Sequence, residues 1–270
     1  MLSLIIGDIV NQTDYIEELL TKWAPQVNEI VFLGNYFGGP MEDKDAAIRT
    51  AEWLVKSTAG STKRVHLLGN ADVDYLLFTG VPASPSYSIA KAKAIAKVFP
   101  AEFIHSFKIA HHTQDWLLSH AGVTKHWIHQ DVSSTEMKAA YLNQKLKKHL
   151  EIPNNRNLFT PGVTRGGYNE QPGPLWCDWF LDFDPSPGVN QICAHTPVPS
   201  TCIKTWSNNQ SLCFIPFTPE FPLPRGETQN LSINTGLSQF ILLNDGQPFA
   251  ITPGVENLDC AILKPLIRWI

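Results

Sequence analysis

Mainly apolar runs alternate with amphipathic helical patterns along the first third of the chain, and this alternation restricts the fold more than any other feature. The runs at Leu2–Ile6, Glu29–Leu33 and Arg64–Leu68 are typical of short strands that are largely buried. Between them, apolar residues at helical spacing predict helices at Asn11–Trp23 and Asp45–Val55. Strands that alternate with helices in this way predict βαβ units and a largely parallel sheet.

The rest of the chain is first helical and then rich in strands. Helices are predicted at Ser86–Val98 and Ser133–Leu150, and paired strands at Phe103–Ala110 and Trp116–Ser119. Five more strands are expected, at Asn190–Ala194, Cys202–Trp206, Leu212–Ile215, Leu231–Asn234 and Phe240–Leu243. The last of them is followed by Asn244–Gly246, a strong hairpin turn signal.

No internal repeat or low-complexity linker divides the chain. We therefore expect residues 1–270 to form a single α/β domain with two mixed β-sheets packed face to face and helices outside. The formal net charge of −4 gives no electrostatic basis for binding nucleic acid or an anionic membrane. No run approaches the ~18 apolar residues of a membrane span, so no membrane association is expected.

Cysteine usage favours a reducing compartment. The chain has 5 cysteines, an odd count, and no CxxC motif. A disulfide framework or a zinc knuckle is therefore not expected, and a cytoplasmic location is the simpler interpretation.

Two segments are candidates for contact with a protein partner or with a second copy. Phe214–Arg225 interleaves phenylalanines with prolines, and proline at this density prevents regular ladder pairing. One interpretation is an ordered loop that covers a sheet edge. The other is an arm that docks on another protein, and the apolar tail Leu266–Ile270 is a second such surface.

Polar residues of ligand type stand at the ends of five predicted strands, each beside a small residue. They are Asp8, Asn35, Asn70, His120 and His195. Taken singly, each motif is ordinary turn chemistry. Ligands of α/β sheets bind outside the carboxyl ends of the strands, and glycine lets backbone segments approach closely. The five side chains are therefore expected to converge on one spot.

The same positions carry a resemblance to a known family. The chain contains GDIVN, GNYFGGP, GNAD, SHAG and AHTP in this order. Calcineurin-like metallophosphoesterases, especially the serine/threonine protein phosphatase branch, carry GDxHG, GDxxDRG, GNHE, a His in HAG, and GHT. Leu117–Trp127, Arg165–Gly167, Gly173–Trp179 and Ile233–Gly236 are similar to bacterial and phage-type members. The resemblance covers essentially the whole chain and implies the four-layer α/β/β/α metallophosphatase fold.

The resemblance also implies a pair of metal ions, and the chain departs from it at several ligands. One metal would be held by Asp8 and by the positions of Val10 and Asn35, where the family has a His and a bridging Asp. Valine cannot ligate a metal. The second metal would share the bridging position and use Asn70, His120 and His195, all of which match the family.

Residues implied for proton transfer and phosphate binding are also replaced. Ala71 stands at the general-acid His, and Gly38 at the Asp that pairs with it, so no catalytic residue is expected to remain. Gly39 or Pro40 stands where protein phosphatases place an Arg that grips phosphate. Arg165 remains as a candidate substrate-binding residue.

Charge decides how many metals this residue set can hold. Asp8 is the only carboxylate among the implied ligands, and two divalent ions repel strongly with so little negative charge between them. We therefore expect that the dinuclear centre does not form and that no cofactor is bound at full occupancy. The alternative is one divalent transition metal, zinc or manganese, on Asn70, His120, His195 and Asn35, because neutral nitrogen and amide ligands suit such metals better than magnesium or calcium.

Three functional hypotheses follow. The leading one is a degenerate metallophosphatase, a pseudo-phosphatase whose scaffold serves binding or assembly. The second is a weak phosphoester hydrolase that uses one metal, with Arg165 holding phosphate. The third is a protein that binds a phosphorylated ligand without cleaving it. The fold cannot choose among them, because function resides in the site.

Overall fold

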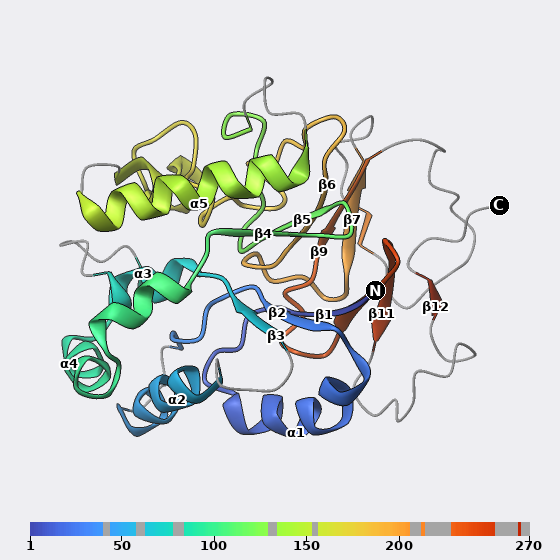
Figure 1. Cartoon of the computed structure of the whole chain (residues 1–270). Coiled ribbons are helices and arrows are strands. Elements are labelled where there is room, and N and C mark those ends of the chain that lie inside the picture. Colours follow the sequence, from blue (N-terminus) through green and yellow to red (C-terminus); the bar gives the residue numbers. More distant parts are fainter. Residues whose placement is uncertain are drawn as a thin grey trace.

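Two six-stranded sheets lie at the centre of the computed structural model of the chain (Figure 1). The structure describes residues 1–39, 44–57, 63–77, 84–128, 134–152, 156–205, 212–213, 228–251 and 264–265. The proposed partner segments Phe214–Arg225 and Leu266–Ile270 lie outside these residues, as does Pro40.

The first sheet carries the N-terminal strands. It has the order β12-β11-β10-β1-β2-β3. Its members are β1 (Leu2–Ile6), β2 (Glu29–Phe32), β3 (Lys63–His66), β10 (Phe240–Asn244), β11 (Gln247–Ile251) and β12 (Lys264–Pro265). Strands β1, β2 and β3 are parallel, and the other three are added antiparallel. The sheet is therefore mixed, with a parallel half formed by the predicted βαβ units.

The second sheet is also mixed. It has the order β4-β5-β6-β9-β7-β8. Its members are β4 (Ala110–Thr113), β5 (Trp116–Ser119), β6 (Asn190–Cys193), β7 (Cys202–Thr205), β8 (Leu212–Cys213) and β9 (Gln229–Ser232). Strands β5, β6 and β9 run parallel to one another. Both sheets therefore contain three parallel strands whose carboxyl ends can supply one site.

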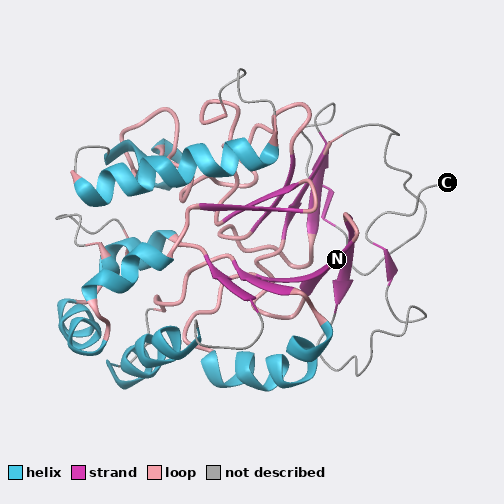
Figure 2. Ribbon diagram, in the orientation of Figure 1, coloured by secondary structure: helices cyan, strands magenta, loops and turns pink. Residues whose placement is uncertain are grey.

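Helices cover the outer faces of both sheets (Figure 2). Helices α1 (Thr13–Trp23) and α2 (Lys44–Ser57) lie over the first sheet, and α5 (Thr135–Glu151) lies over the second (Figure 1). Helices α3 (Asn70–Leu76) and α4 (Ile89–Val98) lie at one end of the molecule, where α4 packs against α2 and α3. The expected four-layer α/β/β/α architecture is confirmed.

Strand alternation explains why the layers hold together. In β1, Leu4 and Ile6 pack in the cluster that includes the helices, whereas Ile5 packs in a separate cluster between the sheets. The inter-sheet cluster joins Val31 of β2 to Ile192 of β6, among others, and its members are almost fully buried. A strand with apolar residues on both faces is what a central layer requires, and it matches the continuous apolar run at Leu2–Ile6.

Most predicted elements are confirmed to within a few residues, including the hairpin turn at Asn244–Gly246. Asp245 and Gly246 have φ of 46° and 85°, the pair of positive values that a type I′ turn requires. The strand expected at Phe103–Ala110 is wrong. Ala101–Ser106 is a 3₁₀ helix that begins after Pro100, and the strand starts at Ala110.

Cysteine usage also needs correction. Cys202 is disulfide-bonded, although no disulfide was expected. The backbone register places Cys213 of β8 directly opposite it. Cys177 and Cys193 are free and buried. Within the described ranges, no helix has both the length and the apolar composition that crossing a bilayer would need.

Candidate functional site

The carboxyl ends of the parallel strands from both sheets meet at one place, and polar side chains fill it. The five residues expected there come together, and a sixth joins them: Asp8 after β1, Asn35 after β2, Asn70 after β3, His120 after β5, His195 after β6 and Asn234 after β9. We call Asp8, Asn35 and Asn234 the aspartate half of the site. Asn70, His120 and His195 form the histidine half.

Glycines allow the loop of Asn35 to approach the loop of Asn70 closely. A Cβ on Gly34 would lie 2.4 Å from the backbone nitrogen of Gly69, and Gly34 also has a φ of +103°. A Cβ on Gly69 would lie 2.3 Å from the nitrogen of Asn35. No other residue fits these two positions without displacing backbone, so the glycines of the second and third motifs serve loop contact.

Several site residues have left-handed backbone. Asn35 has a φ of 52°, His195 a φ of 64° and Val10 a φ of 43°. This conformation is uncommon for non-glycine residues, especially a β-branched one, and such residues cluster at functional sites. The loops hold these side chains in fixed directions at some cost in backbone energy.

Asp8 is fully engaged by neutral donors. Asn35 Nδ2 donates to Asp8 Oδ2 at 2.9 Å, and Asn234 Nδ2 donates to the same oxygen at 3.2 Å. The backbone N–H of His195 donates to Asp8 Oδ1 at 3.2 Å. Asp8 is only 8% exposed, so these hydrogen bonds supply the stabilisation that solvent would otherwise give its charge.

The orientation of the Asn35 amide follows from its two neighbours. The backbone N–H of Ala71 donates to Asn35 Oδ1 at 3.1 Å, and Asp8 can only accept from Nδ2. With the amide flipped, Asn35 Nδ2 would face the donor Ala71 N, and Asn35 Oδ1 would face the acceptor Asp8 Oδ2. An N–H group therefore points at Asp8, in the place where the family resemblance implies a shared metal ion.

The histidine half is arranged differently. Asn70 Oδ1 lies 3.0 Å from His120 Nε2 and 3.0 Å from His195 Nδ1. The two imidazole rings meet edge to face, with centroids 5.1 Å apart. His195 Nε2 is buried and has no hydrogen-bond partner among the described residues. Three potential ligand groups thus share one small space.

Tautomer and charge of the two histidines follow from their surroundings. His120 Nδ1 lies 2.9 Å from the carbonyl oxygen of Leu33, which can only accept, so Nδ1 carries the proton. Burial lowers the pKa of His120, although Asp8 and the Leu33 carbonyl act in the other direction. Burial, then the neighbouring His120 and Arg165, lower the pKa of His195. Both rings are therefore neutral, and His120 Nε2 carries a lone pair. It faces Asn70 Oδ1, which can also only accept, so no hydrogen bond joins these two atoms.

Asp72 ties the second loop to the third. Its carboxylate accepts from the backbone N–H groups of Asn35 and Gly69 at 2.8 Å and from those of Tyr36 and Phe37 at 2.8 and 3.2 Å. Burial raises the pKa of Asp72 to about 7, although these four N–H groups act to lower it. Asp72 does not reach the site itself, and it positions Asn35.

Arg165 lies at the edge of the site but is already paired. Its Nη2 lies 2.7 Å from Asp178 Oδ2 and donates to Thr196 Oγ1 at 3.1 Å. Its charge lowers the pKa of His195, which places it within electrostatic reach of the histidine half. A phosphate ligand would have to compete with Asp178 for this guanidinium.

Donor atoms that could face a metal ion are left unprotonated or unpartnered in the histidine half only. In the aspartate half, the side-chain amide of Asn35 and two other donors already hydrogen-bond to the Asp8 carboxylate. A cation would have to displace these donors. In the histidine half, His120 offers a lone pair while its other nitrogen donates to a carbonyl, which is the usual arrangement of a metal-binding histidine. The orphaned Nε2 of His195 is a second available donor atom. Among the described residues, no group of three His, Cys, Asp or Glu side chains could hold a metal.

Asn234 and Asp72 were not identified as site residues from the sequence. Asn234 follows a strand end as the other five do, but its neighbours are Ile233 and Thr235, so the adjacent small residue that marked the other five is lacking. Asp72 stands three residues after the residue that precedes α3, where an acidic side chain commonly accepts from the first N–H of a helix. That signal was missed because the short helix α3 was not predicted.

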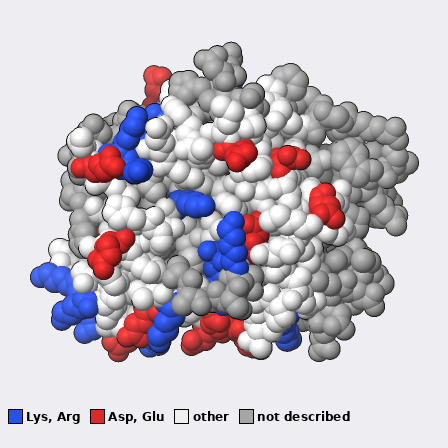
Figure 3. Space-filling model, in the orientation of Figure 1, with Lys and Arg blue, Asp and Glu red and all other residues white. Residues whose placement is uncertain are grey.

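Charges on the described surface are mixed. On the face shown in Figure 3, basic and acidic side chains are interspersed and neither sign forms a continuous field. This distribution agrees with the small net charge of −4 and gives no electrostatic direction to a partner on that face.

Comparison with known proteins gives the fold. No family model matches the sequence, and no curated protein matches it. The cold-active protein-tyrosine phosphatase of a psychrophilic Shewanella species superimposes with a TM-score of 0.57 at 12% identity, covering 93% of this chain and 77% of that one. A second structure of a cold-active protein tyrosine phosphatase gives 0.53 at 13% identity, covering 93% and 76%. A metallophosphoesterase from Sphaerobacter thermophilus gives 0.46 at 14% identity, covering 90% and 83%.

Proposed function

We propose that this chain, which has the calcineurin-like metallophosphoesterase fold, is a pseudo-phosphatase that keeps the scaffold for binding or assembly. The single observation that supports this most is the hydrogen bond from Asn35 Nδ2 to Asp8 Oδ2, at 2.9 Å. It places an N–H donor where two-metal hydrolysis needs a cation. The aspartate half of the site is therefore satisfied internally.

Loss of the aspartate half removes the basis of two-metal chemistry. Such chemistry needs two ions a few ångströms apart, with a nucleophile and the leaving oxygen held between them. Asp8 is the one carboxylate among the implied ligands. At Ala71, where the resemblance implies a general acid, a methyl group offers no proton, and losing a general acid typically lowers the rate by ~10²–10⁴-fold.

A weaker second candidate is a hydrolase with one metal on the histidine half. It is favoured by the lone pair of His120 Nε2 and by the unpartnered Nε2 of His195. Asn70, His120 and His195 would hold the ion, which would supply Lewis acidity when bound. The residues of this chain would orient the phosphoryl group through Arg165, but only after displacing Asp178.

The third candidate, a protein that binds a phosphorylated ligand without cleaving it, would rest on Arg165 as well. The Arg165–Asp178 ion pair at 2.7 Å weakens this candidate, because exchange of one anion for another gains little. Partner binding through Phe214–Arg225 or Leu266–Ile270 remains part of the leading proposal.

An activity assay on matched variants tests the proposal. Purified wild-type protein is assayed on a generic aryl phosphate with added manganese or zinc, beside His195→Ala. We expect no turnover above buffer in either protein. Metal-dependent turnover that disappears in His195→Ala would establish the one-metal hydrolase in place of the pseudo-phosphatase.

A further inference from the structure

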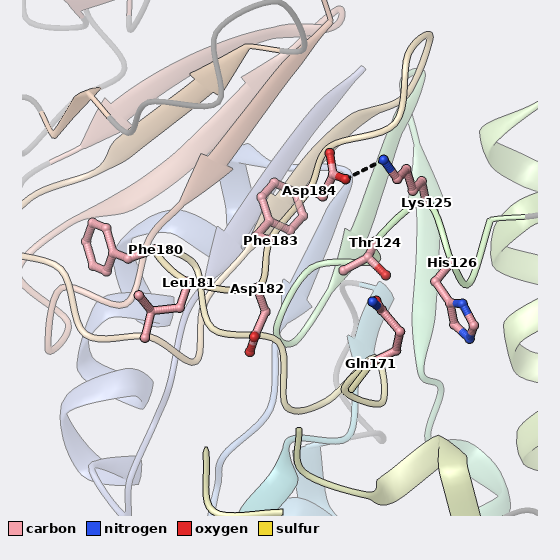
Figure 4. Close-up of a pocket in the computed structure, with 9 residues that line it drawn as sticks. All are labelled: Thr124, Lys125, His126, Gln171, Phe180, Leu181, Asp182, Phe183 and Asp184. Carbon is pink, nitrogen blue, oxygen red and sulfur yellow. Dashed lines mark ion pairs between the residues drawn. The ribbon is translucent and has the colours of Figure 1, made fainter. Parts of the chain in front are cut away.

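A pocket separate from the metal site opens between two loops of the second sheet. It encloses about 460 Å³ and lies beside the loops that follow β5 and precede β6. Its lining combines aromatic, apolar, amide, hydroxyl and charged groups, all labelled in Figure 4. We propose that it receives an arginine side chain of a partner protein. This proposal does not depend on whether the candidate site binds a metal ion.

One wall of the pocket belongs to the core. Phe183 is 1% exposed and stacks on Trp179 with ring centroids 4.8 Å apart. The backbone N–H of Lys125 donates to the carbonyl oxygen of Asp184 at 3.4 Å, and the side chains of the same residues form an ion pair at 2.6 Å. The two loops are thus fastened to each other on one side of the pocket.

Asp182 is the acidic residue of the pocket without a cation. Its Oδ2 accepts from Thr164 Oγ1 at 2.5 Å and from the backbone N–H of Asp178 at 3.0 Å, both neutral donors. The neighbouring carboxylates Asp178 and Asp184 are paired with Arg165 and Lys125. Among the residues that the structure describes, none forms an ion pair with Asp182. A cationic ligand would therefore gain attraction here without displacing an existing partner.

Thr124 adds a second, independent indication. It lines the pocket and is 2% exposed, and its Oγ1 has no hydrogen-bond partner among the described residues. A buried hydroxyl without a partner is destabilising. A ligand that brings N–H donors would relieve this cost.

The shape of the lining favours arginine over lysine. Phe180 and Leu181 are 46% and 73% exposed, and in the view of Figure 4 they flank the side of the pocket opposite His126. A guanidinium is planar, carries five N–H donors and stacks on aromatic rings. It can meet Asp182 and the Gln171 amide while its aliphatic stem covers the apolar edge. The ammonium group of lysine is a compact charge, so it would make poorer contact with the Phe180 ring and the Gln171 amide.

The test is an NMR titration of isotope-labelled protein with N-acetyl-arginine methylamide. The citrulline analogue, which keeps the shape but lacks the charge, and the lysine analogue are titrated alongside. We expect the arginine probe to shift the backbone amides of Thr124, Gln171 and Phe180, and the citrulline probe to bind about 10- to 100-fold more weakly. Equal binding of citrulline, equal binding of lysine, or no shift at these amides would each overturn the proposal.

Two variants assign the effect to the pocket. Asp182→Asn should weaken arginine binding by about 10- to 100-fold, and Thr124→Val by about 3- to 10-fold. Thr124→Val removes only an unpartnered hydroxyl, so its unfolding midpoint should equal or exceed that of the wild type, and binding can be judged on folded protein. Asp45→Asn, on the exposed face of α2, is the matched charge control and should bind like the wild type. Unchanged binding in both pocket variants would contradict the assignment.

Discussion

Placing a carboxylate at position 35, as the resemblance implies, should make the thermal stability of the protein depend on bound metal. In Asn35→Asp, a carboxylate replaces the N–H that now lies 2.9 Å from Asp8 Oδ2. The hydrogen bond lost has a charged acceptor, and such bonds contribute about 1.5–3 kcal/mol. Two carboxylates at that separation repel by up to about 6 kcal/mol for an effective dielectric constant near 20.

The protein can escape part of this repulsion by sharing one proton between the two carboxylates, as like-charged pairs do. The net loss should therefore grow with pH. At pH 8 with a chelator present, we expect about 2–4 kcal/mol of destabilisation, which lowers the unfolding midpoint by roughly 5–15 °C in a chain of this size. Near pH 5 the loss should be smaller.

A divalent cation should reverse the effect, because it would find two carboxylates where the wild type offers one. The assay is thermal unfolding of wild type and variant in chelator and in manganese, at both pH values. Asn28→Asp is the control: it adds the same charge on a surface loop, where the side chain accepts from Leu2 N at 2.7 Å. Equal stability of Asn35→Asp and the wild type in chelator at pH 8 would show that Asp8 does not depend on the Asn35 amide.

Three other outcomes are expected. Burial raises the pKa of Glu29, but hydrogen bonds from His111, Thr113 and Ser3 outweigh it and lower the pKa from 4.5 to about 2. Glu29 should therefore contribute about 3 kcal/mol to the free energy of unfolding above pH 4.5, and this contribution should be lost as the pH falls toward 2. Urea unfolding against pH measures this contribution, and Glu29→Gln should lack it. Gly34→Ala should destabilise by more than about 2 kcal/mol, because its Cβ would lie 2.4 Å from backbone at a φ of +103°; a midpoint within error of wild type would contradict the loop contact. Asn234→Ala should leave the fold intact but cost about 1–3 kcal/mol, because it removes the donor to Asp8 and to the His195 carbonyl oxygen, and unchanged chemical denaturation would show that these two bonds are not needed.

The sequence predicted best those features that depend on neighbours along the chain. The run Leu2–Ile6 is apolar on both faces, and the structure places those faces in two different clusters. The site residues were found because each follows a strand and stands beside a small residue. Topology then brings these strand ends together, whatever the details of packing.

Features that depend on contacts across the fold were missed. The strand expected at Phe103–Ala110 overlaps a 3₁₀ helix, Ala101–Ser106, from which Ile104 packs into the core. Helix α3 has seven residues, and its Asp72 accepts hydrogen bonds from a distant loop. The disulfide at Cys202 depends on which strand lies opposite β7, and no local pattern gives that register.

The hydrogen bond between Asn35 and Asp8 could not be read from residue types either. The sequence lacks a carboxylate and a histidine at the implied ligand positions. These two changes are equally consistent with a site that binds metal weakly and with a site that binds none. The structure adds the direction of the amide, which is fixed by Ala71 N on one side and Asp8 on the other. The direction of the amide favours complete loss of metal binding in the aspartate half over a reduced affinity.

Metal stoichiometry distinguishes an aspartate half that holds no metal ion from one that does. The wild-type protein is saturated with manganese or zinc, passed through a desalting column and analysed by plasma mass spectrometry. We expect at most one ion per chain, and its loss in His195→Ala. Two ions per chain, both retained on desalting, would contradict it, because Asp8 would then be a ligand and not the acceptor of the Asn35 amide.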